Sequence, residues 1–365
     1  MSNIIENNRY DIVTLLRAFG IILMVLAHAM PPEHIVWKII YCFHMPLFFI
    51  MSGYCFKDKY LSSAKEFVIR KLKGIYLPMV LFSLPILLLH NLFCKLNIYD
   101  PTWIYTWKDY AWNGLRIISR MSLNEGMLGA FWFLKALFLG NIIFYFLYKM
   151  ILFLFKDQFD KKYHLPILLI ALLLISEISS IFHLRIPYFG VDEYSINAAF
   201  YIALGYFWSL NDVKLNHLVI WILGILAIAL KIYYIPDVVF GNTNSITFFG
   251  FAIPAIIGTI MAWNLCCFIY KYSPNFILVV LEKIGKNTIW IMALHFLSFK
   301  LVSYIYILLN NLYVDNLVDF PILTRCIHVP YMWGIYTIIG IALPMCFGKI
   351  FMIIKNKYTK VVYEK

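Results

Sequence analysis

Two side chains that could take part in chemistry, Arg17 and His28, lie within one apolar stretch near the start of the chain, Asp11–Met30. Charged residues are costly inside a membrane-spanning helix, so they normally face a protein interior or a wet cavity and tend to be functional. His28 follows Arg17 by eleven residues, which places both side chains on nearly the same helix face, about 16 Å apart along the axis. Interfacial anchoring would explain either residue alone, but the shared face favours a cation and a titratable base with linked functions.

The next apolar stretch, residues 36–56, adds a second imidazole and a surface of small residues. If the two stretches form antiparallel neighbouring helices, His44 lies at a depth close to that of His28, where one ring can share a substrate proton or orient the other. Ser52 and Gly53 permit close approach either by another helix or by a slender ligand. Both interpretations of this small surface stay open.

A basic cluster, Arg70-Lys71-Leu72-Lys73, precedes the third apolar stretch. Arg70 and Lys73 are three residues apart and share a face of an α-helix. Such a pair can bind lipid head groups or the phosphates of a soluble anionic cofactor. Lipid anchoring is the simpler explanation from this cluster alone.

Further polar groups occur in apolar stretches later in the chain: Lys135, His295 and Lys300. Packing and function explain His295 equally well. Glu125 and Glu177 are the carboxylates best placed along the sequence to pair with these groups, and we predict such pairs.

The segment Cys94–Gly126 is rich in Tyr and Trp. These rings can stack on sugars, although an aromatic belt at a membrane interface explains them almost as well. The sequence contains no Gly-rich phosphate loop, nucleophile elbow or paired metal-ligand motif. No metal site is therefore expected.

The composition indicates that these groups belong to a membrane protein. Of the 365 residues, 62% are hydrophobic and only 14% are charged, which excludes an ordinary soluble globule and predicts a polytopic membrane protein. The formal net charge is +12, but the basic residues lie between apolar stretches and are explained by loops on the cytoplasmic side. We expect no nucleic-acid partner.

The fold class predicted is all-α, with about ten transmembrane helices, because backbone polar groups in lipid must be satisfied within each segment. The placement of Lys and Arg predicts that both termini are cytoplasmic. We expect residues 1–365 to form a single membrane domain without a fused soluble domain. The predicted segments are residues 12–30, 36–56, 75–93, 127–153, 165–182, 195–210, 217–235, 245–270, 287–309 and 331–354.

Together these residues resemble the acyltransferase family 3 membrane O-acyltransferases, and especially the sugar O-acetylases among them. The resemblance covers nearly the whole chain. Its most specific motif is the Arg-x10-His spacing of Arg17 and His28. The family's Arg-x-x-Arg is here Arg70-x-x-Lys73, which loses one planar guanidinium fork. The other matching motifs are Phe48–Gly53, Trp132–Leu134 and Gly285–His295.

The resemblance implies a membrane O-acetyltransferase that uses acetyl-CoA as the donor. The phosphates of acetyl-CoA would bind from the cytoplasm near Arg17, Arg70 and Lys73. His28 would deprotonate a sugar hydroxyl in the outer half of the membrane. His44 or Glu125 would orient the base or the acceptor. We also assign Ser52 and His295 to the donor site.

The acceptor implied is a sugar in a cell-surface glycan or in its lipid-linked precursor, and the location is the bacterial cell membrane. Membrane lipids are expected partners, and a homodimer stays open. The main alternative is a transporter or flippase of a glycan intermediate without acyl chemistry, in which buried charges line a path. A third hypothesis is a membrane sensor or scaffold in which the imidazoles respond to pH.

Overall fold

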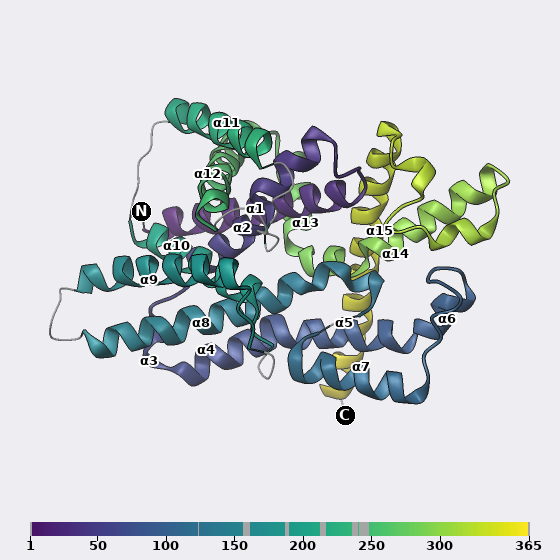
Figure 1. The fold of residues 1–365 in the computed structure, drawn as a ribbon, viewed down its shortest axis with the longest axis horizontal. Helices are drawn as coiled ribbons and strands as arrows, with labels where there is room; N and C mark the ends of the chain where they lie inside the picture. Colours follow the sequence, from purple (N-terminus) through teal and green to yellow (C-terminus); the bar gives the residue numbers. More distant parts are fainter. Residues whose placement is uncertain are drawn as a thin grey trace.

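The computed structural model describes residues 2–122, 124–155, 161–186, 190–211, 217–235, 240 and 248–363. Apart from one isolated bridge between Ile186 and Val191, these residues form helices, turns and loops (Figure 1). The helices are α1 (Ser2–His28), α2 (Ile35–Tyr54), α3 (Lys59–Ser62), α4 (Ala64–Lys71), η1 (Leu72–Tyr76), α5 (Leu77–Leu88), α6 (His90–Lys95), α7 (Trp107–Arg120), η2 (Gly126–Phe131), α8 (Trp132–Leu154), α9 (Lys161–Phe182), α10 (Glu193–Leu210), α11 (His217–Tyr234), α12 (Phe248–Tyr272), α13 (Asn275–Lys286), α14 (Thr288–Leu309), η4 (Val314–Val318), η5 (Thr324–Cys326) and α15 (Pro330–Tyr363).

The all-α polytopic fold is confirmed, and a helix occurs in each of the ten predicted segments. Among the described residues, eight helical segments are long and apolar enough to cross a membrane. A shorter apolar helix, Leu218–Tyr234, corresponds to the seventh predicted segment. The eight are Asp11–His28, Ile35–Tyr54, Ala64–Leu88, Gly126–Leu154, Tyr163–Phe182, Phe248–Tyr272, Thr288–Leu309 and Pro330–Ile354.

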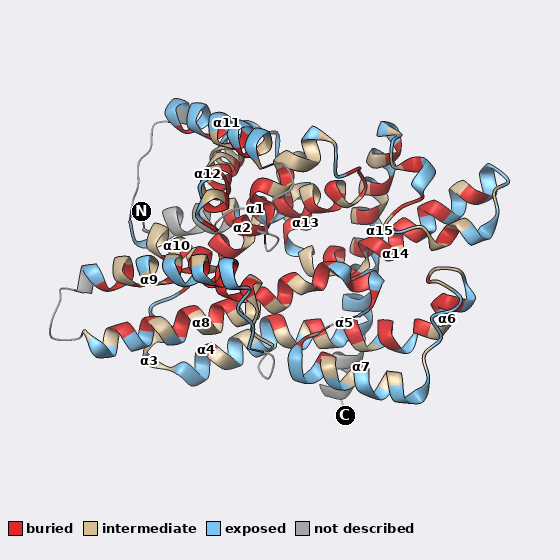
Figure 2. Cartoon of the chain, in the orientation of Figure 1, coloured by how far each residue is buried: buried red, intermediate tan, exposed pale blue. Residues whose placement is uncertain are grey.

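Helix α10 is the least lipid-like of the predicted segments, and its position explains why. It packs against α2, α8 and α9, and it is largely buried whereas α11 is largely exposed (Figure 2). Its buried face includes Ser195 and Asn197. Because protein rather than lipid surrounds α10, polar side chains can find partners on neighbouring helices, as Asn197 Nδ2 does with Ser180 Oγ of α9 at 3.5 Å.

The α2–α10 contact depends on two glycines that face each other across it. A Cβ atom added at Gly53 would overlap the Ile202 carbonyl oxygen, and one added at Gly205 would overlap the Ile50 carbonyl oxygen. Backbones this close are typical of small residues at helix interfaces in membranes. Gly53 therefore serves helix packing.

We expect Gly205→Ala to destabilise the protein by at least about 1–3 kcal/mol, because the added methyl group has no space between the two backbones. Thermal unfolding of the purified protein measures this effect. Gly334→Ala is the matched control, since a Cβ at that position of α15 would meet no atom within 4 Å outside its chain neighbours and its own helix backbone. Equal melting temperatures for the two variants would contradict this packing.

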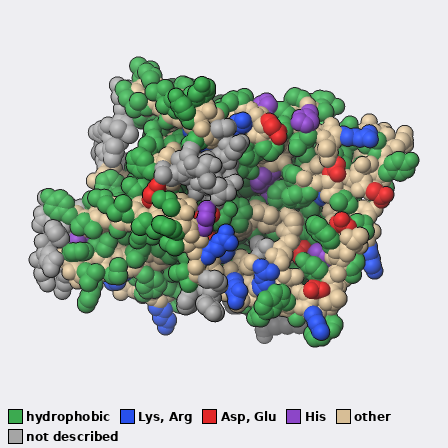
Figure 3. Space-filling model, in the orientation of Figure 1, with side chains coloured by type: hydrophobic (Ala, Val, Ile, Leu, Met, Phe, Trp, Pro, Cys, Tyr) green, Lys and Arg blue, Asp and Glu red, His purple; other side chains and the backbone are tan. Residues whose placement is uncertain are grey.

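Hydrophobic side chains dominate the left half of the face shown in Figure 3, as expected for a surface in contact with lipid. The charged side chains on this face gather mainly in its right half. In Figure 1 that half contains α6 and α7. The segment Cys94–Gly126, which is rich in Tyr and Trp, contains an amphipathic helix, α7, which packs against α5 and begins with a capping box between Thr106 and Asp109.

Candidate functional site

Helix α1 lines two cavities, one at each of its two candidate functional side chains. Arg17 lines a cavity of about 390 Å³, here called the Arg17 cavity. His28 lines a second cavity of about 470 Å³, the His28 cavity. Met24 and Met45 line both of them. The two thioether side chains are therefore the shared wall between the cation and the base.

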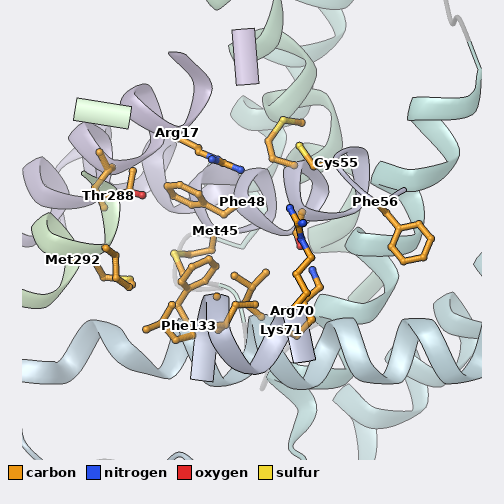
Figure 4. A pocket seen from close by; sticks show the side chains of 18 of the residues that line it. Arg17, Met45, Phe48, Cys55, Phe56, Arg70, Lys71, Phe133, Thr288 and Met292 are labelled. Atoms are coloured by element: carbon orange, nitrogen blue, oxygen red, sulfur yellow. The ribbon is translucent and has the colours of Figure 1, made fainter. Parts of the chain in front are cut away.

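Cations reach the Arg17 cavity from two sides. The Arg17 guanidinium points into it from α1, and Arg70 and Lys71 extend toward it from the opposite side (Figure 4). Aromatic and aliphatic side chains, including Phe48 and Phe133, form much of the remaining wall. Positive groups in an otherwise apolar pocket fit a ligand with phosphates and a slender, less polar arm.

Lys73 does not line the Arg17 cavity in the described structure. It lies with Arg70 on a shallow, open groove that also includes Lys65. The helix changes here from α4 to the π-helix η1, whose wider turn alters which side chains share a face. Arg70, in α4, lines both the groove and the cavity. Lys71, the last residue of α4, is a further cation of the cavity that the sequence did not single out.

Ser52 lines the Arg17 cavity, and its neighbour Gly53 packs against α10. The Ser52 hydroxyl also bonds the Asn141 side chain on α8, with Oγ 3.2 Å from Oδ1. The two interpretations of the small surface therefore apply to adjacent residues, with the ligand cavity on one side and helix packing on the other.

The base end of α1 is organised by a histidine pair. His28 Nδ1 lies 2.9 Å from His295 Nε2, and His295 Nδ1 lies 3.1 Å from the Ile291 carbonyl and 3.0 Å from that of Met292. Carbonyl oxygens only accept hydrogen bonds, so His295 Nδ1 carries the hydrogen and its neutral ring accepts at Nε2. His28 must then donate from Nδ1, and its basic lone pair is on Nε2.

His295 is thus placed beside His28, and it does not line the Arg17 cavity. Its side chain is fully buried, and its ring also contacts Phe296 and Phe299. A ring held this firmly can fix the tautomer and orientation of its neighbour. The structure therefore connects His295 with the predicted base rather than with the predicted donor site.

His44 lines the His28 cavity together with His28, as their predicted similar depth requires. Its Nδ1 lies 2.8 Å from the Ile40 carbonyl, one turn earlier in α2. By the same reasoning Nδ1 donates, and the basic nitrogen is Nε2. Two neutral imidazoles with unprotonated Nε2 atoms therefore face one cavity.

Glu125 also lines the His28 cavity, but the pairing predicted for it is wrong. Its Oε2 lies 2.9 Å from His90 Nδ1, and both side chains are almost completely buried. Lys135 pairs instead with Asp192, at 2.9 Å. Sequence position gave the depths of these groups but did not identify which helices pack together.

The other predicted carboxylate pairing is also wrong. Glu177 accepts a hydrogen bond from the Phe249 backbone at 3.0 Å. Lys300 donates to the Leu317 and Asp319 carbonyls, at 2.6 and 2.7 Å. Lys300 therefore ties α14 to the loop that follows it, where backbone carbonyls take the place of a carboxylate.

His90, the partner of Glu125, was not singled out in the sequence. The available signal was its place at the end of the third apolar stretch, where an imidazole is an unusual boundary residue. Among the described residues, no group of three or more His, Cys, Asp or Glu side chains could hold a metal ion.

Comparison with known proteins places this arrangement in a family. A family model described as an acyltransferase domain, that of acyltransferase family 3, matches residues 10–349. No curated protein and no solved structure matches the chain significantly. The family match includes both cavities and the helices that form them, and the chain therefore belongs to acyltransferase family 3.

Proposed function

We propose that this membrane acyltransferase takes an acetyl group from acetyl-CoA in the Arg17 cavity and transfers it to a sugar hydroxyl in the His28 cavity. The observation that supports this most directly is the shared wall of Met24 and Met45 between the two cavities. A ligand anchored by cations on one side of this wall can present its reactive end to the bases on the other.

The donor site combines charge with an apolar channel. Arg17, Arg70 and Lys71 supply positive charge for the phosphates of CoA, and the surrounding aromatic rings suit its pantetheine arm. The rise of about 16 Å from Arg17 to His28 along α1 is the distance that this arm must cover. With the Arg17 end of α1 facing the cytoplasm, as the loop charges predict, the donor comes from the compartment that contains acetyl-CoA.

The chemical step uses the lone pair that the histidine pair leaves on His28 Nε2. His28 removes the proton of the acceptor hydroxyl as its oxygen attacks the thioester carbon. The new C–O bond forms, the C–S bond breaks, and the same proton passes to the departing thiolate, which leaves as CoA with a free thiol. His295 stabilises the transient imidazolium by accepting a hydrogen bond from Nδ1.

Heating the purified protein with CoA or acetyl-CoA tests the donor assignment. A ligand that binds only the folded protein stabilises it, by about 2.7 kcal/mol at a concentration one hundred times Kd. We expect both compounds to raise the melting temperature, and pantetheine, which lacks the nucleotide phosphates, to raise it far less. If saturating CoA leaves the melting temperature unchanged, the donor site is wrong and a transporter becomes the better explanation.

The acceptor proposed is a sugar of a cell-surface glycan or of its lipid-linked precursor, modified at the cell membrane of a bacterium. Mass analysis of surface glycans from a deletion strain tests this assignment. Loss of an acetyl mass increment, restored by the wild-type chain, would support it. An unchanged glycan profile would contradict it.

A further inference from the structure

A third cavity, of about 720 Å³, adjoins the His28 cavity through a single shared side chain. It lies between the segment that joins α6 to α7 and the loop that follows α14. A hydrogen bond of 3.1 Å between Asn97 and Asp315 joins these two regions, and both lie at the right of Figure 1. We call it the aromatic cavity, because Tyr99, Trp103, Tyr105 and Phe320 are in its lining.

The shared side chain is Glu125, which is only 4% exposed. One carboxylate oxygen, Oε2, is bound to His90. The other, Oε1, is buried and has no hydrogen-bond partner among the residues that the structure describes. Leaving a buried acceptor unpaired is costly, so an oxygen in this state where two cavities meet is a natural place for a ligand donor.

His90 holds Glu125 in a fixed orientation. Its Nε2 lies 2.7 Å from the Trp103 carbonyl, so Nε2 carries a hydrogen and a single proton bridges Nδ1 and Oε2. The imidazole also stacks on Tyr105, with ring centroids 3.4 Å apart and an interplanar angle of 4°. Three contacts on one ring hold the Glu125 carboxylate in place, and its Oε1 has no partner with hydrogen-bond geometry in the described structure, although the Tyr99 and Tyr105 phenols lie close to the carboxylate.

The phenols near Glu125 keep their hydrogens. Burial, and then the negative charge of Glu125, raise the pKa of Tyr105 to about 12. The same two causes, in the same order, raise the pKa of Tyr99. Both residues therefore remain hydrogen-bond donors throughout the physiological pH range.

The opposite wall is also fixed. Lys300 binds the Leu317 and Asp319 carbonyls, so the loop that carries Phe320 is tied to α14. The Phe320 ring in turn packs against Phe296, with centroids 4.8 Å apart, and Phe296 packs against His28 at 4.9 Å. One continuous set of rings connects the aromatic cavity to the base.

The charges of the lining indicate what kind of ligand fits. Asp100 and Asp109 belong to the described lining, which contains no Lys or Arg, while His90 and Glu125 share a proton and together carry no net charge. A phosphate or an acidic sugar would be repelled there. An uncharged pyranose has flat C–H faces that pack on aromatic rings and hydroxyl groups that donate to carboxylates.

We propose that the aromatic cavity binds an uncharged sugar ring of the acyl acceptor, and that Glu125 Oε1 accepts a hydrogen bond from the ring and directs a hydroxyl into the His28 cavity. This inference rests on the proposed acyl transfer. Glu125 here binds and orients the acceptor, while His28 takes the proton.

Hydrogen exchange with a panel of methyl glycosides tests the site directly. The panel contains the methyl pyranosides of glucose, galactose, mannose and N-acetylglucosamine, with methyl glucuronide as the acidic comparison. Each compound is used at up to about 100 mM, because a millimolar Kd corresponds to a binding free energy of only about −4 kcal/mol. We expect at least one uncharged member to slow exchange in residues 98–105, and the glucuronide to have no effect.

Two variants then test the contacts, with acetyl transfer to the best member of the panel as the readout. Glu125→Gln is expected to raise the acceptor KM about ten-fold and Trp103→Leu about three- to ten-fold, with kcat within two-fold of the wild type (~0.4 kcal/mol). Trp107→Leu is the matched control, because Trp107 is exposed and is not part of the cavity lining. Acetyl-CoA should stabilise all three variants as it stabilises the wild type.

The possible failures are distinguishable. If no pyranoside protects residues 98–105 while acetyl-CoA still stabilises the protein, the sugar site is wrong and the donor proposal stands. Equal protection by the glucuronide overturns the charge argument. If Glu125→Gln lowers kcat and leaves KM unchanged, Glu125 takes part in the proton transfer instead. If acetyl-CoA does not stabilise even the wild-type protein, both proposals are overturned together.

Discussion

His28→Ala protein is expected to transfer acetyl groups about 10²–10⁴ times more slowly than the wild type, which is the range that a positioned general base contributes. Its affinity for acetyl-CoA should be unchanged, because His28 lines the His28 cavity and not the cavity that contains the three cations. Single-turnover acetyl transfer measures the first effect, and the melting temperature with acetyl-CoA measures the second. His328→Ala is the control, since His328 is exposed and belongs to neither cavity lining.

The histidine pair makes this prediction sharper. His295→Ala should slow transfer by less than His28→Ala, because it removes the group that orients the base and leaves the base itself. The double variant should be no slower than His28→Ala alone, since residues that act as a unit have non-additive effects. Additive losses would show that His295 acts independently, and full activity of His28→Ala would exclude His28 as the base.

Arg17→Ala is expected to raise the Kd of acetyl-CoA roughly ten- to one-hundred-fold. Hydrogen bonds to charged groups contribute about 1.5–3 kcal/mol, and Arg17 points into the cavity from the side opposite Arg70 and Lys71 (Figure 4). Titration by thermal stabilisation gives the Kd values. At saturating donor, kcat should be close to that of the wild type, because the proposed reaction takes place in the His28 cavity, which Arg17 does not line.

Arg17→Lys separates charge from shape. It keeps the positive charge but loses the planar fork, so its Kd should lie between those of the wild type and Arg17→Ala. Arg325→Ala, at an exposed position outside the Arg17 cavity, is the control. A normal Kd in Arg17→Ala together with a large fall in kcat would contradict the donor assignment.

Periodicity and hydropathy could predict the elements because each depends on local sequence. The apolar stretches became helices, and the spacing of Arg17 and His28 placed one residue at each of two cavities along α1. Local reasoning was less successful where the helix type changed. The π-helix Leu72–Tyr76 depends on how its neighbours pack, and Lys73 within it lines the open groove instead of the Arg17 cavity. Lys71, the last residue of α4, lines the cavity but was not singled out in the sequence.

Partners across the fold could not be predicted from the sequence. The His28–His295 contact joins residues 267 positions apart, and the Glu125–His90 pair joins two helical regions whose packing no local pattern encodes. Carboxylates were matched with cations because opposite charges attract, but Lys300 donates to backbone carbonyls, and the one Glu125 oxygen that is paired binds an imidazole. The depth of a side chain in the membrane follows from its position within its own helix, whereas its partner on another helix does not.

The methionine wall between the two cavities also bears on the ion gradient that a cell membrane must maintain. A proton that crosses the membrane dissipates about 2.3 kcal/mol for each 100 mV of potential, and polar side chains at both ends of α1 are potential relay points. The thioethers of Met24 and Met45 cannot donate a proton and are only weak acceptors, while their unbranched chains can rotate aside for a slender ligand. In the proposed acyl transfer, such a partition would let a slender acyl thioester pass while offering protons no strong donor or acceptor between Arg17 and His28.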